Sequence, residues 1–272
     1  MPRFSRAGTT IDYTDTGAPA GRLEAPTILF GHGLLFSGWQ FNLQIYALRR
    51  YYRCLAIDWR GQGASSGAAR PYDMDTLTED AAHLVRSLGV APAHYVGLSM
   101  GGFVGIRLAA RHPELVRSLV LMNTSAGPED PAKADRYRTM ARIYRFTGIG
   151  PLRRAVLPLM FGPAFLADPD SEDVIDEWER RLRRYPRSSV RDAVLAVANR
   201  AGVEDELAAI DVPTLVIGGA QDAATPPAHA QALAAGIRGA RLEIIDDCGH
   251  SSPLERPDVV TELLRGFLLE HT

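Results

Sequence analysis

Cysteine is nearly absent from this chain of 272 residues, which holds only Cys54 and Cys248. Two cysteines do not form the kind of framework that braces small secreted domains, so we expect no disulfide scaffold. Cys54 stands in the apolar run 53–57, which predicts a buried and inert thiol. Cys248 precedes His250 by two residues, and we expect packing rather than chemistry from it. This usage of cysteine favours a cytoplasmic location.

Long apolar runs and an excess of one charge are also missing. No stretch approaches the roughly 18 apolar residues of a membrane span, and residues 1–6 lack the apolar core of a secretory signal. The 30 Lys and Arg residues are balanced by 32 Asp and Glu residues, so we expect no nucleic-acid partner and no membrane partner. Neither a metal-ligand cluster nor a phosphate-binding glycine loop is present, and we expect no metal and no cofactor.

Short apolar strands alternate with amphipathic helices along most of the chain. This alternation predicts an α/β fold, with a mostly parallel, doubly wound sheet that helices cover on both faces. The expected strands are residues 26–30, 54–57, 94–98, 115–122, 214–218 and 242–245. The expected helices are residues 39–51 with Ser37 as a cap, a helix from Asp75 to Gly89, one from Ser99 to before Pro113, and residues 257–269.

Residues 126–207 depart from this alternation. They are helix-prone, rich in arginine and interrupted by prolines, and they show no strand pattern. We therefore expect a helical insertion between two parts of one core, residues 1–125 and 208–272. Acidic residues match the arginines of the insertion, which indicates a solvated charged surface.

The stretch Gly97-Leu98-Ser99-Met100-Gly101 is the most informative part of the sequence. A predicted strand precedes it and a predicted helix follows it, which is the context of a nucleophile elbow. A serine on such a sharp turn is held in a strained backbone conformation, and the glycines let neighbouring backbone pass close by. The pattern predicts an exposed hydroxyl above the sheet, beside a helix N-terminus that favours negative charge.

A serine hydroxyl needs a base within hydrogen-bonding reach and an acid that orients the base. Of the seven histidines, His250 is the one that follows a predicted strand and precedes the last helix, at the edge where open α/β sheets bind ligands. Asp222 follows the strand 214–218 and lies at the same edge. The other common position for the acid holds Asn123. We therefore predict a triad of Ser99, Asp222 and His250, in the chain order typical of this architecture.

An oxyanion hole requires two backbone N–H groups that point at the developing negative oxygen. Met100 supplies one because it follows the nucleophile. The loop His32-Gly33-Leu34-Leu35, after the first parallel strand, is expected to supply the other. Leu34 is the first choice for this donor and Leu35 the second. His32 is then a residue that shapes the loop and does not carry a proton.

Together these residues resemble the α/β-hydrolase superfamily. The resemblance rests on His32-Gly33, the turn Asp58-Trp59-Arg60-Gly61-Gln62-Gly63, the elbow 97–101, Asp222 and Gly249-His250. It implies that residues 126–207 form a helical cap over the site. Within the superfamily the elbow and residues 111–121 look most like small carboxylesterases and hydrolases of the 3-oxoadipate enol-lactone type. Ser99 argues against the members that use an aspartate nucleophile.

The function that follows is hydrolysis of a small-molecule ester or lactone through an acyl-serine intermediate, with His250 as base. A cofactor-free perhydrolase or a C–C bond hydrolase with the same triad is the alternative. A ligand receptor built on a hydrolase fold is a third possibility, because fold alone does not fix function.

The substrate pocket is the least defined feature of the sequence. We expect Leu34, Phe36, Trp39 and Met100 to line its floor. Met160, Phe161 and Trp178 are expected to face it from the cap. The cap arginines, such as Arg138 or Arg142, leave open whether a substrate carboxylate is bound, and solvated arginines are the default interpretation.

Overall fold

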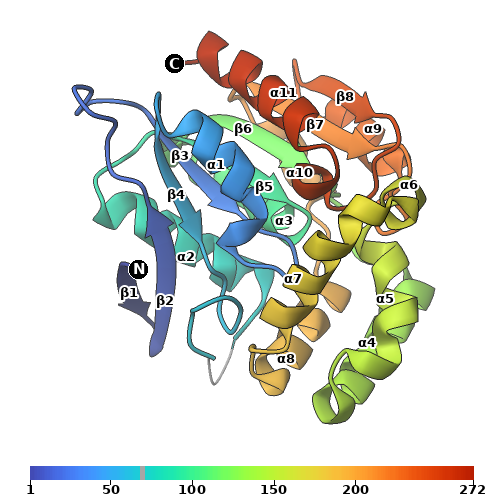
Figure 1. Ribbon diagram of the computed structural model, residues 1–272. Helices are drawn as coiled ribbons and strands as arrows, with labels where there is room; N and C mark the ends of the chain where they lie inside the picture. Colours follow the sequence, from blue (N-terminus) through green and yellow to red (C-terminus); the bar gives the residue numbers. More distant parts are fainter. Residues whose placement is uncertain (68–70) are drawn as a thin grey trace.

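The computed structural model describes residues 1–67 and 71–272, and across these residues eight strands form one twisted sheet (Figure 1). The strand order is β1-β2-β4-β3-β5-β6-β7-β8. β3 to β8 run parallel, whereas β1 and β2 pair antiparallel at one edge. The strands are β1 Arg3–Arg6, β2 Thr9–Asp15, β3 Thr27–Gly31, β4 Arg53–Ile57, β5 Ala93–Leu98, β6 Val116–Met122, β7 Thr214–Gly219 and β8 Arg241–Ile245.

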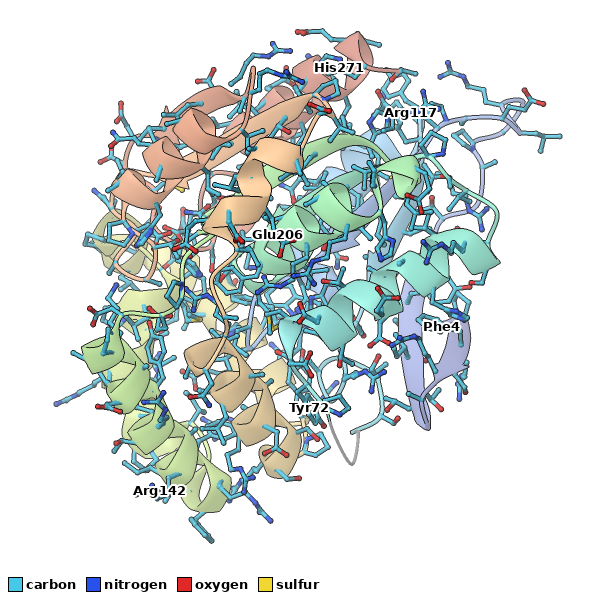
Figure 2. All side chains as sticks on the ribbon, turned by 180° about the vertical axis from the view of Figure 1, so that it is seen from behind. Phe4, Tyr72, Arg117, Arg142, Glu206 and His271 are labelled. Carbon is cyan, nitrogen blue, oxygen red and sulfur yellow. The ribbon has the colours of Figure 1, made fainter. Side chains whose placement is uncertain are left out.

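Helices cover both faces of the sheet, and alternate strand residues supply two separate apolar cores. One core joins α2 (Met74–Ser87), α3 (Met100–Arg111) and α9 (Pro227–Gly236). These helices lie in front of the sheet in Figure 2, where the molecule is seen from behind. The other joins α1 (Asn42–Leu48) and α11 (Pro257–Glu270). On β3, Leu29 enters the first core, while Ile28 and Phe30 enter the second, as the two-residue period of a strand requires. Burial on both faces explains why these strands appear as continuous apolar runs.

The predicted α/β class with a mostly parallel sheet is confirmed, and the predicted strands lie within a residue or so of the observed ones. The antiparallel pair β1–β2 was not predicted, and its residues are largely polar. Two helix starts differ from expectation. α2 begins at Met74, one residue before the expected start at Asp75, and its cap is Asp73, whose carboxylate accepts from Thr76 N. Ser37 precedes a short 3₁₀ turn, Gly38–Phe41, and makes no side-chain cap there.

Between β6 and β7 the chain forms a helical layer above the carboxyl edge of the sheet, shown in yellow and green in Figure 1. Its helices are α4 Pro131–Thr147, α5 Arg153–Met160, α6 Pro163–Ala167, α7 Glu172–Leu182 and α8 Arg187–Ala198, and we name residues 131–198 the cap. A third apolar cluster joins the cap to Leu35 and Phe36 of the loop after β3. Among the described residues, no helix is both long enough and apolar enough to cross a membrane.

Candidate active site

Ser99 lies on a strained turn between β5 and α3. Its φ is 52°, a region that residues with a side chain seldom adopt, and its N–H donates to Met122 O at 2.9 Å. A Cβ atom at Gly101 would stand 2.0 Å from the carbonyl oxygen of Gly31, and one at Gly97 would stand 2.4 Å from that of Gly101. The glycines of the elbow are therefore required by backbone contact.

The side chains of Ser99, His250 and Asp222 form one hydrogen-bonded run. Ser99 Oγ lies 2.9 Å from His250 Nε2, and His250 Nδ1 lies 2.8 Å from Asp222 Oδ2. All three residues are buried, and each follows a different parallel strand, β5, β8 and β7. Because the carboxyl ends of parallel strands meet at one edge of the sheet, residues 151 positions apart come into contact.

Asp222 is fully engaged as an acceptor. Oδ1 accepts from the N–H groups of Ala224 and Thr225 at 2.8 and 2.9 Å, and Oδ2 accepts from Thr225 Oγ1 at 2.8 Å. Burial alone would raise the pKa of this carboxyl, but the charge and hydrogen bond of His250, together with Asn123, hold its pKa below the ordinary value. Asp222 therefore stays ionised beside the imidazole.

Asn123 belongs to this site, although the sequence analysis considered it only as a missing acid. Its Nδ2 donates to Asp222 Oδ2 and to Gly249 O, both at 2.9 Å, and its Oδ1 accepts from Ser252 Oγ at 2.7 Å. The amide thus ties the acid to the loop that carries His250. Its position directly after β6 was the signal available in the sequence.

The loop after β3 has two candidate N–H donors, and the structure distinguishes them. The N–H of Leu35 donates to Gln62 Oε1 at 2.8 Å, so it is occupied. No hydrogen bond among the described residues uses the N–H of Leu34 or that of Met100, the first residue of α3. His32 shapes this loop, since its Nδ1 donates to Gly33 O and its Nε2 accepts from Trp59 N. Burial lowers the pKa of His32 to about 3 and keeps the ring neutral.

A buried carboxylate, Glu255, holds the loop that carries His250 against the cap. Its oxygens accept from Gly249 N at 2.7 Å, Ser251 N at 2.8 Å and Gly162 N of the cap at 2.9 Å. Burial raises the pKa of Glu255, against the opposing effect of these three N–H groups. The sequence analysis missed this residue. Its position in the short helix α10 (Ser252–Glu255), just after His250, was the available signal.

A cavity of about 90 Å³ lies between the cap and the carboxyl edge of the sheet, and Ser99 and His250 form part of its wall. Seven of its twenty lining residues come from α4 and α8, and none of these seven was named from the sequence. On α4 the spacing i, i+3, i+4, i+7 of four such residues marks a helix face that the sequence already contained. The missed lining residues include Phe103, Tyr137, Met140, Ala141, Tyr144, Val156, Val190 and Val194.

Of the predicted pocket residues, Leu34 and Met160 line the cavity, whereas Met100 is not among its lining residues. Phe36, Trp39, Phe161 and Trp178 instead pack on one another, with ring centroids of Phe36 and Trp178 6.2 Å apart and of Phe161 and Trp178 5.9 Å apart. The prediction for these four residues is wrong: their rings belong to the apolar cluster that joins the cap to the core, and they do not line the cavity.

The cap arginines named from the sequence do not reach the cavity. Arg138 donates to Asn199 Oδ1 at 2.7 Å and to Asp135 Oδ1 at 2.6 Å. Arg142 is exposed on the outer end of α4 (Figure 2). Within residues 1–67 and 71–272, no group of three or more His, Cys, Asp or Glu side chains has the arrangement of a metal site.

Comparison with known proteins identifies the family of the chain. The family model of the α/β hydrolase fold matches residues 26–257. The chain is 31% identical to 3-oxoadipate enol-lactonase 2 of Acinetobacter baylyi over 97% of each chain. The crystal structure of the enol-lactonase from Burkholderia xenovorans LB400 superposes with a TM-score of 0.90 at 31% identity, over 98% of this chain and 100% of that one. A thermophilic esterase from Thermogutta terrifontis, solved with malate bound, gives a TM-score of 0.90 at 28% identity over 100% of both chains. The elbow, the strand order and these matches establish that the chain belongs to the α/β-hydrolase family.

Proposed function

We propose that this protein hydrolyses a carboxylic ester or lactone of a small molecule through an acyl-serine intermediate. The observation that carries the proposal is the run of hydrogen bonds from Ser99 Oγ through the His250 imidazole to Asp222. The similarity to enol-lactonases and an esterase supports the same class of reaction.

In the first half-reaction, His250 Nε2 takes the proton of Ser99 Oγ while that oxygen attacks the substrate carbonyl carbon. The carbonyl oxygen becomes negative and accepts from the N–H groups of Leu34 and Met100. Asp222 accepts from His250 Nδ1–H and stabilises the imidazolium. When the tetrahedral intermediate collapses, the C–O bond to the leaving alcohol breaks, and His250 gives that oxygen its proton. An acyl ester on Ser99 remains.

In the second half-reaction, water replaces the alcohol. His250 Nε2 takes a proton from the water, whose oxygen attacks the acyl carbon, and the same two N–H groups bind the oxyanion. Collapse breaks the bond to Ser99 Oγ, which regains a proton from His250. The products are a carboxylic acid and the free enzyme. For a lactone, acid and alcohol are parts of one product.

Removal of the nucleophile tests the proposal directly. Ser99→Ala should remain folded and lose turnover of p-nitrophenyl butyrate by about 10⁶-fold, because no other group can form the acyl intermediate. Ser87→Ala, at the exposed end of α2, is the matched control and should keep full activity. Wild-type protein should also release product through many turnovers, which a receptor would not do. Turnover that requires added hydrogen peroxide would indicate a perhydrolase. Retained hydrolysis in Ser99→Ala would refute the mechanism.

A further inference from the structure

The wall of the cavity beside Ser99 contains a negatively charged side chain and no lysine or arginine among its described residues. Glu129 contributes a carboxylate to the wall, and His250 contributes its imidazole. The rest of the wall is mainly apolar, with contributions from Phe103, Met140, Val156, Val190 and Val194. A bound group therefore meets hydrocarbon on most sides and a carboxylate on one.

Glu129 is one half of a buried ion pair that spans the cavity wall. Its Oε2 lies 2.8 Å from Arg200 Nη1, and the side chains of Arg200 and Glu129 are only 4% and 12% exposed. Glu129 lines the cavity, whereas Arg200 lines a separate groove on the other side of the wall, beside Asp192. The ion pair thus presents its negative end to the site of Ser99.

The guanidinium of Arg200 is already committed to protein acceptors. Its cation also lies 4.1 Å from the ring centroid of Phe103, which separates it from the cavity. The remaining hydrogen bonds run to Gly127 O at 3.2 Å, Val197 O at 3.1 Å and Ser125 Oγ at 3.2 Å. Arg200 is therefore not free to receive a substrate carboxylate.

The other basic side chains near the cavity do not line it. Lys133 Nζ donates to the carbonyl oxygens of Ala223 and Ala224 at 3.3 and 3.1 Å. Tyr137 does line the cavity, and burial, assisted by the charge of Glu129, raises the pKa of its hydroxyl to about 12. An anion placed here would lose its water, find no cation, and stand near the Glu129 carboxylate.

We infer that the half of the substrate that occupies this cavity is an uncharged, apolar group, and that Glu129 is a specificity residue that excludes carboxylate-bearing esters and lactones. The inference rests on the proposed hydrolysis at Ser99 and narrows its substrate class. The Glu129–Arg200 ion pair then has a role in substrate selection as well as in stability, because its orientation places the carboxylate, and not the guanidinium, in the cavity wall.

Matched esters that differ by one charge test this inference. With wild-type protein, p-nitrophenyl hexanoate should show a kcat/KM about 100-fold above that of the mono-p-nitrophenyl ester of adipic acid. Hexyl acetate and 6-acetoxyhexanoate form the corresponding pair for the alcohol half. A preference of this kind is expected for whichever half enters the cavity. Equal rates within both pairs, or preference for either anion, would overturn the inference.

Variants then assign the preference to Glu129. Glu129→Gln retains an amide oxygen for Arg200 and should reduce the discrimination about tenfold, mainly through faster hydrolysis of the anionic ester. Asp135→Asn removes an exposed carboxylate of α4 and is the matched control, with discrimination unchanged. Met140→Lys places a cation in the wall and should raise activity on the anionic ester, so it serves as a second measurement if Glu129→Gln fails to fold.

Binding separates a failure of this inference from a failure of the proposed reaction. The dissociation constants of Ser99→Ala for two ligand pairs are measured by calorimetric titration. One pair is methyl hexanoate and monomethyl adipate, and the other is hexyl acetate and 6-acetoxyhexanoate. In the pair whose variable group occupies the cavity, the neutral ester should bind about 100-fold more tightly than the anion. If wild-type protein hydrolyses neither chromogenic ester but this binding preference holds, only the hydrolase proposal fails. If hydrolysis occurs and neither pair shows a preference, only the charge inference fails.

Discussion

At the scale of single residues, the pKa values of His250 and Asp222 move in opposite directions because the two groups face each other. Burial alone would lower the pKa of His250, but the charge and hydrogen bond of Asp222 raise it above the ordinary 6.5. The same contact lowers the pKa of the Asp222 carboxyl. In the proposed mechanism, this contact stabilises the imidazolium that forms during each half-reaction.

The pH profile should report this shift. Only the neutral imidazole accepts the serine proton, so kcat/KM rises with pH through the pKa of His250, and the half-maximum of the acidic limb is expected above pH 6.5. In Asp222→Asn the charge that raises the pKa is gone. The acidic limb should move to lower pH and kcat should fall about 10⁴-fold. A limb below pH 6.5 in the wild type, or an unchanged limb in the variant, would contradict the assignment.

The close backbone contact at Gly101 gives a prediction for stability. Gly101→Ala would place a methyl 2.0 Å from the Gly31 carbonyl oxygen, and backbone on both sides must shift to admit it. We expect a loss of about 3 kcal/mol or more in the free energy of unfolding, measured with urea. Gly266→Ala is the control, because nothing lies within 4 Å of its added methyl in α11. That change should be neutral or stabilising by up to about 1 kcal/mol.

At the scale of elements, Glu255 joins two loops that belong to different parts of the chain. Glu255→Gln replaces one acceptor oxygen by an NH₂ group that would face a backbone N–H. We expect a loss of about 2 kcal/mol in stability and a lower kcat, because the peptide groups that flank His250 lose their anchor. Urea unfolding and steady-state kinetics measure both. Glu262→Gln, which alters an exposed pair with Arg265, should change neither. Normal stability in Glu255→Gln would show that the bonds contribute little.

Elements and site differ in how far the sequence could predict them. The parallel strands were predictable because burial on both faces leaves apolar runs. The residues proposed for the triad were named because each lies within five residues of the carboxyl end of such a strand. The aromatic residues of the cap were misplaced, since sequence cannot tell whether Trp178 contacts another ring or a cavity. Glu255 was missed because its partners are backbone N–H groups, which no residue type reveals, so that its place just after His250 was the available signal.

At the scale of the whole molecule, the cap and the sheet enclose the cavity between them, so its size limits the substrate. Ala141→Leu adds bulk to a buried position in the cavity wall. The ratio of kcat/KM for p-nitrophenyl hexanoate over p-nitrophenyl acetate should fall at least about tenfold, with the acetate value little changed. Ala132→Leu, on the exposed face of α4, is the control. An unchanged ratio would place the longer acyl chain elsewhere.

The anchoring of Gly162 to Glu255 has a consequence for access to the site. The Glu255 carboxylate also holds the peptide N–H groups on both sides of His250. If the cap moved away at Gly162, it would therefore pull His250 away from Ser99. Any movement of the cap that leaves the contact of His250 with Ser99 intact must therefore keep Gly162 in place.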